Sequence, residues 1–234
     1  MEKLLNELVK RLQEAYGGDL VSVVLYGSAA SGDQQAKFSD LNVIAVLKEV
    51  GVAELRKGDK AIQWWIKQKQ PAPLLISVEE ARNSHDAFPI EFLDIQQSHR
   101  VLHGEDLFSQ IEVSRTNHRR QVEHELRSSL LRLRQRYLSA HPKENDVVQL
   151  MAKSLPTIAT LARHALILAS AAAPARKREV LEAAAERFGL DPAPLRAVLG
   201  VREGTEKLTG ERVHTLFAAY LEQVQKLAQG VDRL

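Results

Sequence analysis

The sequence predicts an α/β domain built on a small mixed β-sheet, followed by an all-helical bundle domain. In the first half, short β-branched runs alternate with segments of helical periodicity, whereas long alanine-, leucine- and arginine-rich segments replace them from Ile111 onward. The charge is also divided unevenly, because residues 1–110 carry 12 Lys and Arg against 16 Asp and Glu, and residues 111–234 carry 20 against 14. We therefore expect a first domain over 1–108 and a helical domain over 109–234.

The first domain should begin with a helix over Glu2–Tyr16, where leucines recur at helical spacing until Gly17-Gly18 ends the pattern. The β-branched run Leu20–Tyr26 then predicts a strand, and a second strand is expected over Leu41–Leu47. Further elements expected in this half are a turn or short helix at 28–31, a helix over 52–70, a strand over 74–77, one or two helical turns over 78–84 and a strand over 90–96.

The second half predicts five helices, because proline and glycine breaks separate its apolar segments. Their expected ranges are 113–140, 145–172, 175–188, 192–199 and 209–229. The most apolar stretch, Ile158–Ala173, is shorter than the roughly 20 residues of a membrane span and contains Arg163 and His164. A buried helix is therefore expected there, and no membrane partner.

Composition excludes several classes of protein. There is no cysteine, which excludes disulfides and thiolate metal sites, and the histidines show no zinc-ligand spacing. The N-terminus lacks the pattern of a signal peptide, so a cytoplasmic location is expected. A homodimer is compatible with the sequence.

The stretch LYGSAASGDQQAKFSDLN, residues 25–42, contains the first candidate site. Gly27 and Ser28 stand where a strand ends, at a turn that can offer backbone N–H groups to a phosphate. Glycine lets the phosphate approach the backbone, and the serine hydroxyl can donate a further hydrogen bond. Many turns carry Gly-Ser for their geometry alone, so an ordinary turn is the alternative interpretation.

The second candidate is Asp40-Leu41-Asn42 at the start of the next strand. Side chains alternate across a strand, so Asp40 and Asn42 should share a face while Leu41 points the other way. Beside a triphosphate, two such oxygen-bearing side chains could hold Mg²⁺. A turn that leads into a half-buried strand explains the same residues without a metal.

A third carboxylate would be needed to complete a metal site or to accept a proton. The run Ile90–Ile95 contains Glu91 and Asp94. If this run is a strand, the two acids lie on opposite faces and only one of them can reach the site.

Here the sequence resembles a known family. The segment LYGSAASGDQQAKFSDLNVIAVL is similar to the signature of the nucleotidyltransferase superfamily, which includes DNA polymerase β, kanamycin nucleotidyltransferase and the aminoglycoside adenylyltransferases: Gly-Ser, about ten residues, then Asp-x-Asp. The resemblance spans roughly residues 20–106 and includes PIEFLDIQQSHRVLHGEDLF, which is similar to the family's third-acid strand and its ending. It implies an α/β nucleotidyltransferase domain, and the helical second half fits the small-molecule members.

Carried over by position, the resemblance implies that Gly27 and Ser28 bind the nucleoside triphosphate and that Asp40 binds Mg²⁺ or Mn²⁺. Glu91 would complete the metal site or act as the base, with Asp94 in reserve. The segment just downstream could face phosphate or acceptor through His99 and Arg100.

Two departures from the signature stand out. Eleven residues, rather than ten, separate Ser28 from Asp40, which a hairpin loop can absorb. In addition, Asn42 occupies the position of the second aspartate, and a neutral amide is a poorer Mg²⁺ ligand than a carboxylate.

The resemblance therefore implies Mg²⁺-dependent transfer of a nucleoside monophosphate from an NTP, with ATP expected, to a hydroxyl of a small molecule or protein. Because of Asn42, a catalytically impaired nucleotide-binding or antitoxin-like interaction module is the alternative. Nucleic acid is disfavoured as a partner. The predicted helix over 113–140 holds seven arginines, but Glu123 and Glu125 interrupt them and no aromatic side chains are interleaved.

Overall fold

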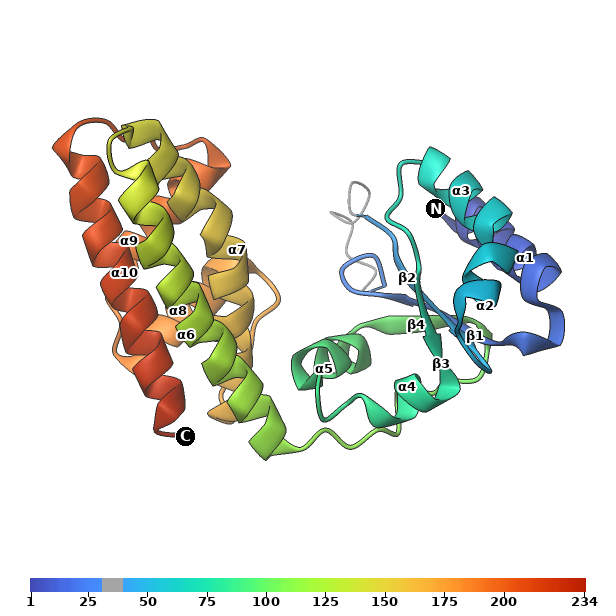
Figure 1. Ribbon diagram of the computed structural model, residues 1–234. Helices are drawn as coiled ribbons and strands as arrows, with labels where there is room; N and C mark the ends of the chain where they lie inside the picture. The colour runs from blue at the N-terminus through green and yellow to red at the C-terminus, as the bar shows by residue number, and fades with distance from the viewer. Residues whose placement is uncertain (31–39) are drawn as a thin grey trace. The chain divides into compact units, whose positions relative to one another are not determined.

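The computed structural model describes residues 1–30 and 40–234 (Figure 1). The chain divides into two compact units, Met1–Ser114 and Arg115–Leu234. The expected fold class is confirmed, because a mixed sheet with helices is followed by a unit made of helices.

The first unit is built on a four-stranded sheet in the order β3-β2-β1-β4. The strands are β1 (Leu20–Tyr26), β2 (Asn42–Leu47), β3 (Leu74–Ser77) and β4 (His99–Gly104). β1 is antiparallel to both β2 and β4, whereas β2 is parallel to β3. The central position of β1 explains its apolar run, which only Ser22 interrupts, since both of its faces are covered.

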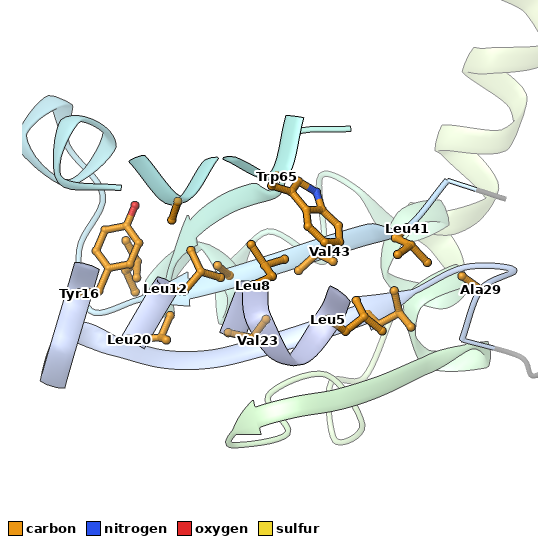
Figure 2. Close-up of a cluster of buried hydrophobic side chains, with 14 residues drawn as sticks. Leu5, Leu8, Leu12, Tyr16, Leu20, Val23, Ala29, Leu41, Val43 and Trp65 are labelled. Atoms are coloured by element: carbon orange, nitrogen blue, oxygen red, sulfur yellow. The ribbon is translucent and has the colours of Figure 1, made fainter. Parts of the chain in front are cut away.

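Three helices cover one face of this sheet, namely α1 (Glu2–Tyr16), α2 (Val52–Lys57) and α3 (Asp59–Lys67). Between α1 and β1 the chain forms the short 3₁₀ helix η1 (Gly17–Asp19). Figure 2 shows the core under these helices, where Leu5 and Leu8 of α1 meet Val23 of β1, Val43 of β2 and Trp65 of α3. The leucine spacing in α1 is therefore the buried stripe of an amphipathic helix.

The segment expected as a single helix over 52–70 is two helices that meet at Gly58. A Cβ atom at Gly58 would lie 1.9 Å from the Tyr16 hydroxyl oxygen, so a side chain cannot fit there. The same hydroxyl donates a hydrogen bond to Glu54 O at 3.2 Å. Close packing of Tyr16 against the backbone thus accounts for a glycine at this junction.

The opposite face of the sheet is covered by α4 (Val78–Asn83) and α5 (Pro89–Gln97). α4 begins with the expected capping box, in which Ser77 Oγ accepts from Glu80 N–H at 3.1 Å and Glu80 Oε2 accepts from Ser77 N–H at 2.7 Å. Phe92 and Ile95 of α5 pack on Val24 of β1 in this second core.

The strand expected over 90–96 is wrong, because these residues belong to α5, and the fourth strand is His99–Gly104. A short apolar run does not distinguish a strand from a buried helix by periodicity. Pro89 occupies the first turn of the helix and Glu91 lies in that turn, both of which favour a helix N-terminus.

The second unit consists of five helices that surround a core of its own. They are α6 (Arg115–Ala140), α7 (Glu144–Leu168), α8 (Lys177–Phe188), α9 (Pro192–Glu203) and α10 (Glu211–Asp232). α7 contacts the other four and contributes the largest set of buried residues, which explains why its sequence is so apolar. No helix in the described parts of the chain is long and apolar enough to cross a membrane.

Candidate functional site

The candidate site begins at the turn that follows β1. Gly27 has a φ of +78°, a conformation that L side chains rarely adopt. Its N–H donates to Ser98 O at 2.9 Å, and its carbonyl accepts from the Ala30 N–H and from Ser98 Oγ, each at 2.9 Å. The Gly27 N–H is therefore committed to the protein, and Ser98 fixes the turn from the start of β4.

The remaining part of this turn can still face a ligand. Ser28 is exposed, whereas the Ala29 side chain is buried at 4% exposure and anchors the turn in the core. Among the described residues, the Ala29 N–H has no hydrogen-bond acceptor. The turn thus offers one backbone donor beside an exposed hydroxyl, which suits a phosphate oxygen. The eleven-residue loop expected to absorb the extra residue, 29–39, lies largely outside the described residues.

Asn42 lies next to this turn. In the antiparallel register Tyr26 pairs with Asn42 on one side and with His99 on the other. Directly paired residues point to the same face, so these three side chains form a row across the sheet, on the face that α5 covers. A Cβ atom on Gly27 would be 3.5 Å from Asn42 Nδ2. The two parts of the sequence signature therefore converge in space.

Asp40 comes immediately before β2, and its side chain is exposed. The intervening Leu41 is buried in the core on the α1 face, and its N–H donates to Gln70 Oε1 at 2.9 Å. Leu41 and Asn42 thus point to opposite sides of the sheet. This anchoring holds the start of β2 beside the Gly27 turn.

Glu91 and Asp94 do not lie on a strand. Three residues apart on α5, they share one side of a helix, rather than lying on opposite faces as a strand would require. Glu91 is exposed in the first helical turn and Asp94 is half-buried. α5 packs on the sheet face to which Asn42 points. Both acids therefore remain on the side of the sheet where the site lies.

His99 and Arg100 are held by the protein itself rather than offered to a phosphate. His99 Nδ1 is 2.9 Å from Ile95 O, and Nε2 is 3.2 Å from Asp106 Oδ2. Arg100 lies on the opposite face, where its guanidinium donates two hydrogen bonds to the Glu2 carboxylate at 2.9 and 3.1 Å. These contacts hold the first two residues of β4, one on each face of the sheet.

Asp106 and Ser109 complete the cluster around His99. Partial burial works to raise the pKa of Asp106, but hydrogen bonds from the Ser109 hydroxyl and N–H, from His99 and from the Phe108 N–H outweigh it and lower the pKa to about 2. Asp106 is therefore a permanent anion at neutral pH. His99 contacts the Asp106 carboxylate through Nε2, and the Ser109 hydroxyl donates to the same carboxylate. This is not the order of a catalytic triad, in which the serine donates to the histidine. The three side chains hold the loop in place, and we call them the Asp106 clamp.

The donor set can be tested against a magnesium ion. Within the described residues, no group of three or more His, Cys, Asp or Glu side chains lies close enough together to hold a metal. Mg²⁺ is commonly held by one or two carboxylates together with substrate phosphates. The exposed carboxylate of Asp40 beside Asn42 fits one such ion shared with a nucleotide, and does not fit a pair of metals held by the protein alone.

Sequence reasoning did not single out Tyr26 or Ser98. Tyr26 lies between Asn42 and His99 in the row, and burial raises its pKa. Ser98 holds the Gly27 turn through two hydrogen bonds. Neither role has a local sequence signal, because both depend on pairing between β1 and β4.

Comparison with known proteins gives a likeness in fold to solved structures. No protein-family model matches the chain, and no curated protein matches it. The crystal structure of the spectinomycin adenyltransferase AAD(9) from Enterococcus faecialis, solved with ATP and spectinomycin, superposes with a TM-score of 0.61 at 14% sequence identity. The match covers 96% of this chain and 99% of that chain. The two chains thus share a fold over nearly their whole length.

Proposed function

We propose that this protein is a nucleotidyltransferase that moves a nucleoside monophosphate from an NTP, with ATP the first candidate, to a hydroxyl of a small molecule or protein. The observation that carries the proposal is the convergence of the Gly27 turn with Asn42, in a chain whose fold matches an adenylyltransferase over 96% of its length. That neighbour was crystallised with ATP and spectinomycin.

In this reaction the acceptor oxygen forms a bond to the α-phosphorus, the bond from that phosphorus to the β-phosphate bridging oxygen breaks, and pyrophosphate leaves. Ser28 and the Ala29 N–H would bind phosphate oxygens. Asp40 would hold Mg²⁺, and the bound ion would neutralise charge on the phosphates. The acceptor's proton would pass to a carboxylate, for which Glu91 is the first candidate and Asp94 the second.

The experiment is incubation with each α-labelled NTP and Mg²⁺ or Mn²⁺, with and without cell extract, followed by separation of labelled products. We expect label from ATP on an acceptor and loss of that label in Asp40→Asn. Glu49→Gln is the matched control, because Glu49 is exposed and lies just beyond the other end of β2. Equal activity in the two variants would reject the assignment of Asp40.

A second candidate function is nucleotide binding without transfer. Asn42 favours it, because an amide replaces a carboxylate at a site where the described residues hold no three-acid group. The substitution Asn42→Asp distinguishes the two proposals. An impaired transferase should gain Mg²⁺-dependent transfer, whereas a binding module should keep its nucleotide affinity and still form no product.

A further inference from the structure

A second site lies within the helical unit, between α6 and α7. A cavity of about 130 Å³ opens there to the surface. Its floor is buried and consists mainly of Leu133, Ile158 and the hydroxyl-bearing Ser129, whose exposures are 2%, 1% and 6%. The complete lining is Ser129, Arg132, Leu133, Arg136, Leu150, Lys153, Ser154, Thr157 and Ile158.

Three cations and no carboxylate line this cavity. Arg132 is partly engaged, because its Nη2 donates to Ser129 Oγ at 3.1 Å and lies 3.6 Å from a Glu125 oxygen. Arg136 and Lys153 make no ion pair or hydrogen bond with any described residue. Asp146 lines an adjacent hollow with Arg136, but the two groups form no ion pair. Like charges placed together without a counter-charge repel one another, and an anion between them removes that cost.

Of the two serine hydroxyls in the lining, only that of Ser129 adds a neutral donor to the floor. Ser154 Oγ donates to Met151 O at 2.9 Å, so the hydroxyl of the buried Tyr220 donates to Ser154 across their 2.9 Å contact. The Ser154 hydroxyl therefore has no donor left for a ligand. Ser129 Oγ accepts from Arg132, and its own proton has no acceptor among the described residues. Ser129 thus adds a buried O–H donor to a lining that also contains three cationic side chains.

We propose that this cavity binds the phosphate group of a small anionic ligand. At roughly 30 Å³ per water molecule, its volume accommodates a group the size of about four waters. Pockets that enclose a whole drug-sized ligand are larger, about 300–1,000 Å³. One phosphate fits, while the rest of the ligand remains outside.

Single-stranded nucleic acid is the weaker alternative. Its binding grooves combine cations with aromatic side chains on which bases stack, and no aromatic residue lines this cavity. The site also lies wholly in Arg115–Leu234, and its chemistry requires no nucleotidyl transfer. The inference can therefore be correct or wrong independently of the proposed function.

The test is isothermal titration of the full-length protein with inorganic phosphate at constant ionic strength. We expect Arg136→Gln and Lys153→Gln each to weaken phosphate binding on the order of tenfold, because each removes a charge-assisted contact. Arg120→Gln is the matched control, since Arg120 is exposed on the same helix, outside the cavity. Its effect should stay below about twofold, because an exposed distant charge is screened. Circular dichroism melting checks that all three variants remain folded.

Two results would overturn the proposal. The first is that the wild type shows no detectable binding of phosphate, or that all three substitutions weaken this binding equally. The other comes from titration with a single-stranded oligonucleotide. If the oligonucleotide binds with a steep salt dependence, and Arg120→Gln weakens it as much as Arg136→Gln, an extended basic surface for nucleic acid replaces the phosphate cavity.

Discussion

At the scale of single residues, the site depends on a glycine, an amide and the strand pairing that brings them together. The sequence motif correctly predicted that Gly27 ends a strand and that Leu41 and Asn42 point to opposite faces. It did not predict that the Gly27 N–H is occupied by Ser98, which is 71 residues away. Long-range hydrogen bonds of this kind leave no local pattern, so only the register of β1 and β4 exposes them.

The conformation of Gly27 gives the first prediction. Gly27→Ala should destabilise the protein by about 1–2 kcal/mol, because φ is +78° and an L side chain is strained there. Space is not the reason, since the nearest atom to the new methyl group, Asn42 Nδ2, lies at 3.5 Å. Urea unfolding measures the change. Gly18→Ala is the control, because Gly18 lacks a positive φ and its Cβ meets nothing within 4 Å. Equal midpoints for the two variants would contradict the argument.

The Asp106 clamp gives a prediction about pH. Its folded pKa, about 2, lies below the ordinary value of 3.8, so its contribution to stability is present above about pH 4. That contribution is lost as the pH falls from about 4 toward 2. Asp106→Asn should therefore unfold at lower urea than the wild type at pH 6, and the two midpoints should approach each other below pH 4. A difference that stays constant from pH 6 to pH 2 would show that the charge of Asp106 is irrelevant.

At the scale of secondary-structure elements, the sequence predicted α1, β1 and β3 well and failed between residues 89 and 104. Leucine periodicity and β-branched runs are local signals, and α1, β1 and β3 carry them clearly. The run from Pro89 to Gln97 is short and apolar, so its helical state is decided by burial of Phe92 and Ile95 against the sheet. Glu91 and Asp94 therefore lie on one helix, rather than on the two faces of a strand.

Two phenylalanines test how α5 is placed on the sheet. Phe92→Ala should cost about 3–5 kcal/mol, because this ring is 6% exposed and packs on Phe108 at a centroid distance of 5.9 Å. Phe88→Ala should cost less than about 1 kcal/mol, because Phe88 precedes the helix and is 52% exposed. Similar costs for the two substitutions in denaturant unfolding would contradict this placement, in which Phe92 is buried against the sheet and Phe88 is exposed ahead of the helix.

At the scale of the whole chain, two units with separate cores share one polypeptide. From the sequence, the acidic first half, the basic second half and the change in segment length after Ile111 predict two domains, with a boundary after residue 108. The first unit extends to Ser114, because Phe108 is fully buried on the sheet and Gln96 Nε2 donates to Phe108 O and Ile111 O at 2.9 and 2.6 Å. These contacts had no sequence signal, since this segment is neither helix nor strand.

Fragments of the chain test the role of that segment. A fragment of residues 1–114 should unfold cooperatively, because it retains both cores of the sheet unit. A fragment of residues 1–106 should be markedly less stable, since it lacks Phe108 and the two acceptors of Gln96. Thermal melting followed by circular dichroism compares them. Identical melting curves would show that the segment contributes nothing to the first unit.

The central claim is that the turn after β1 and the start of β2 together bind the phosphates of a nucleotide. Its most direct test is titration of isotope-labelled protein with MgATP, followed through backbone amide signals by NMR. We expect the largest shifts at Gly27, Ser28, Ala29 and Asn42. Gly18, just before β1, and Glu49, just beyond β2, serve as internal references. If the amides of the turn stay unchanged while ATP saturates the protein, the nucleotide binds elsewhere and the proposed site is wrong.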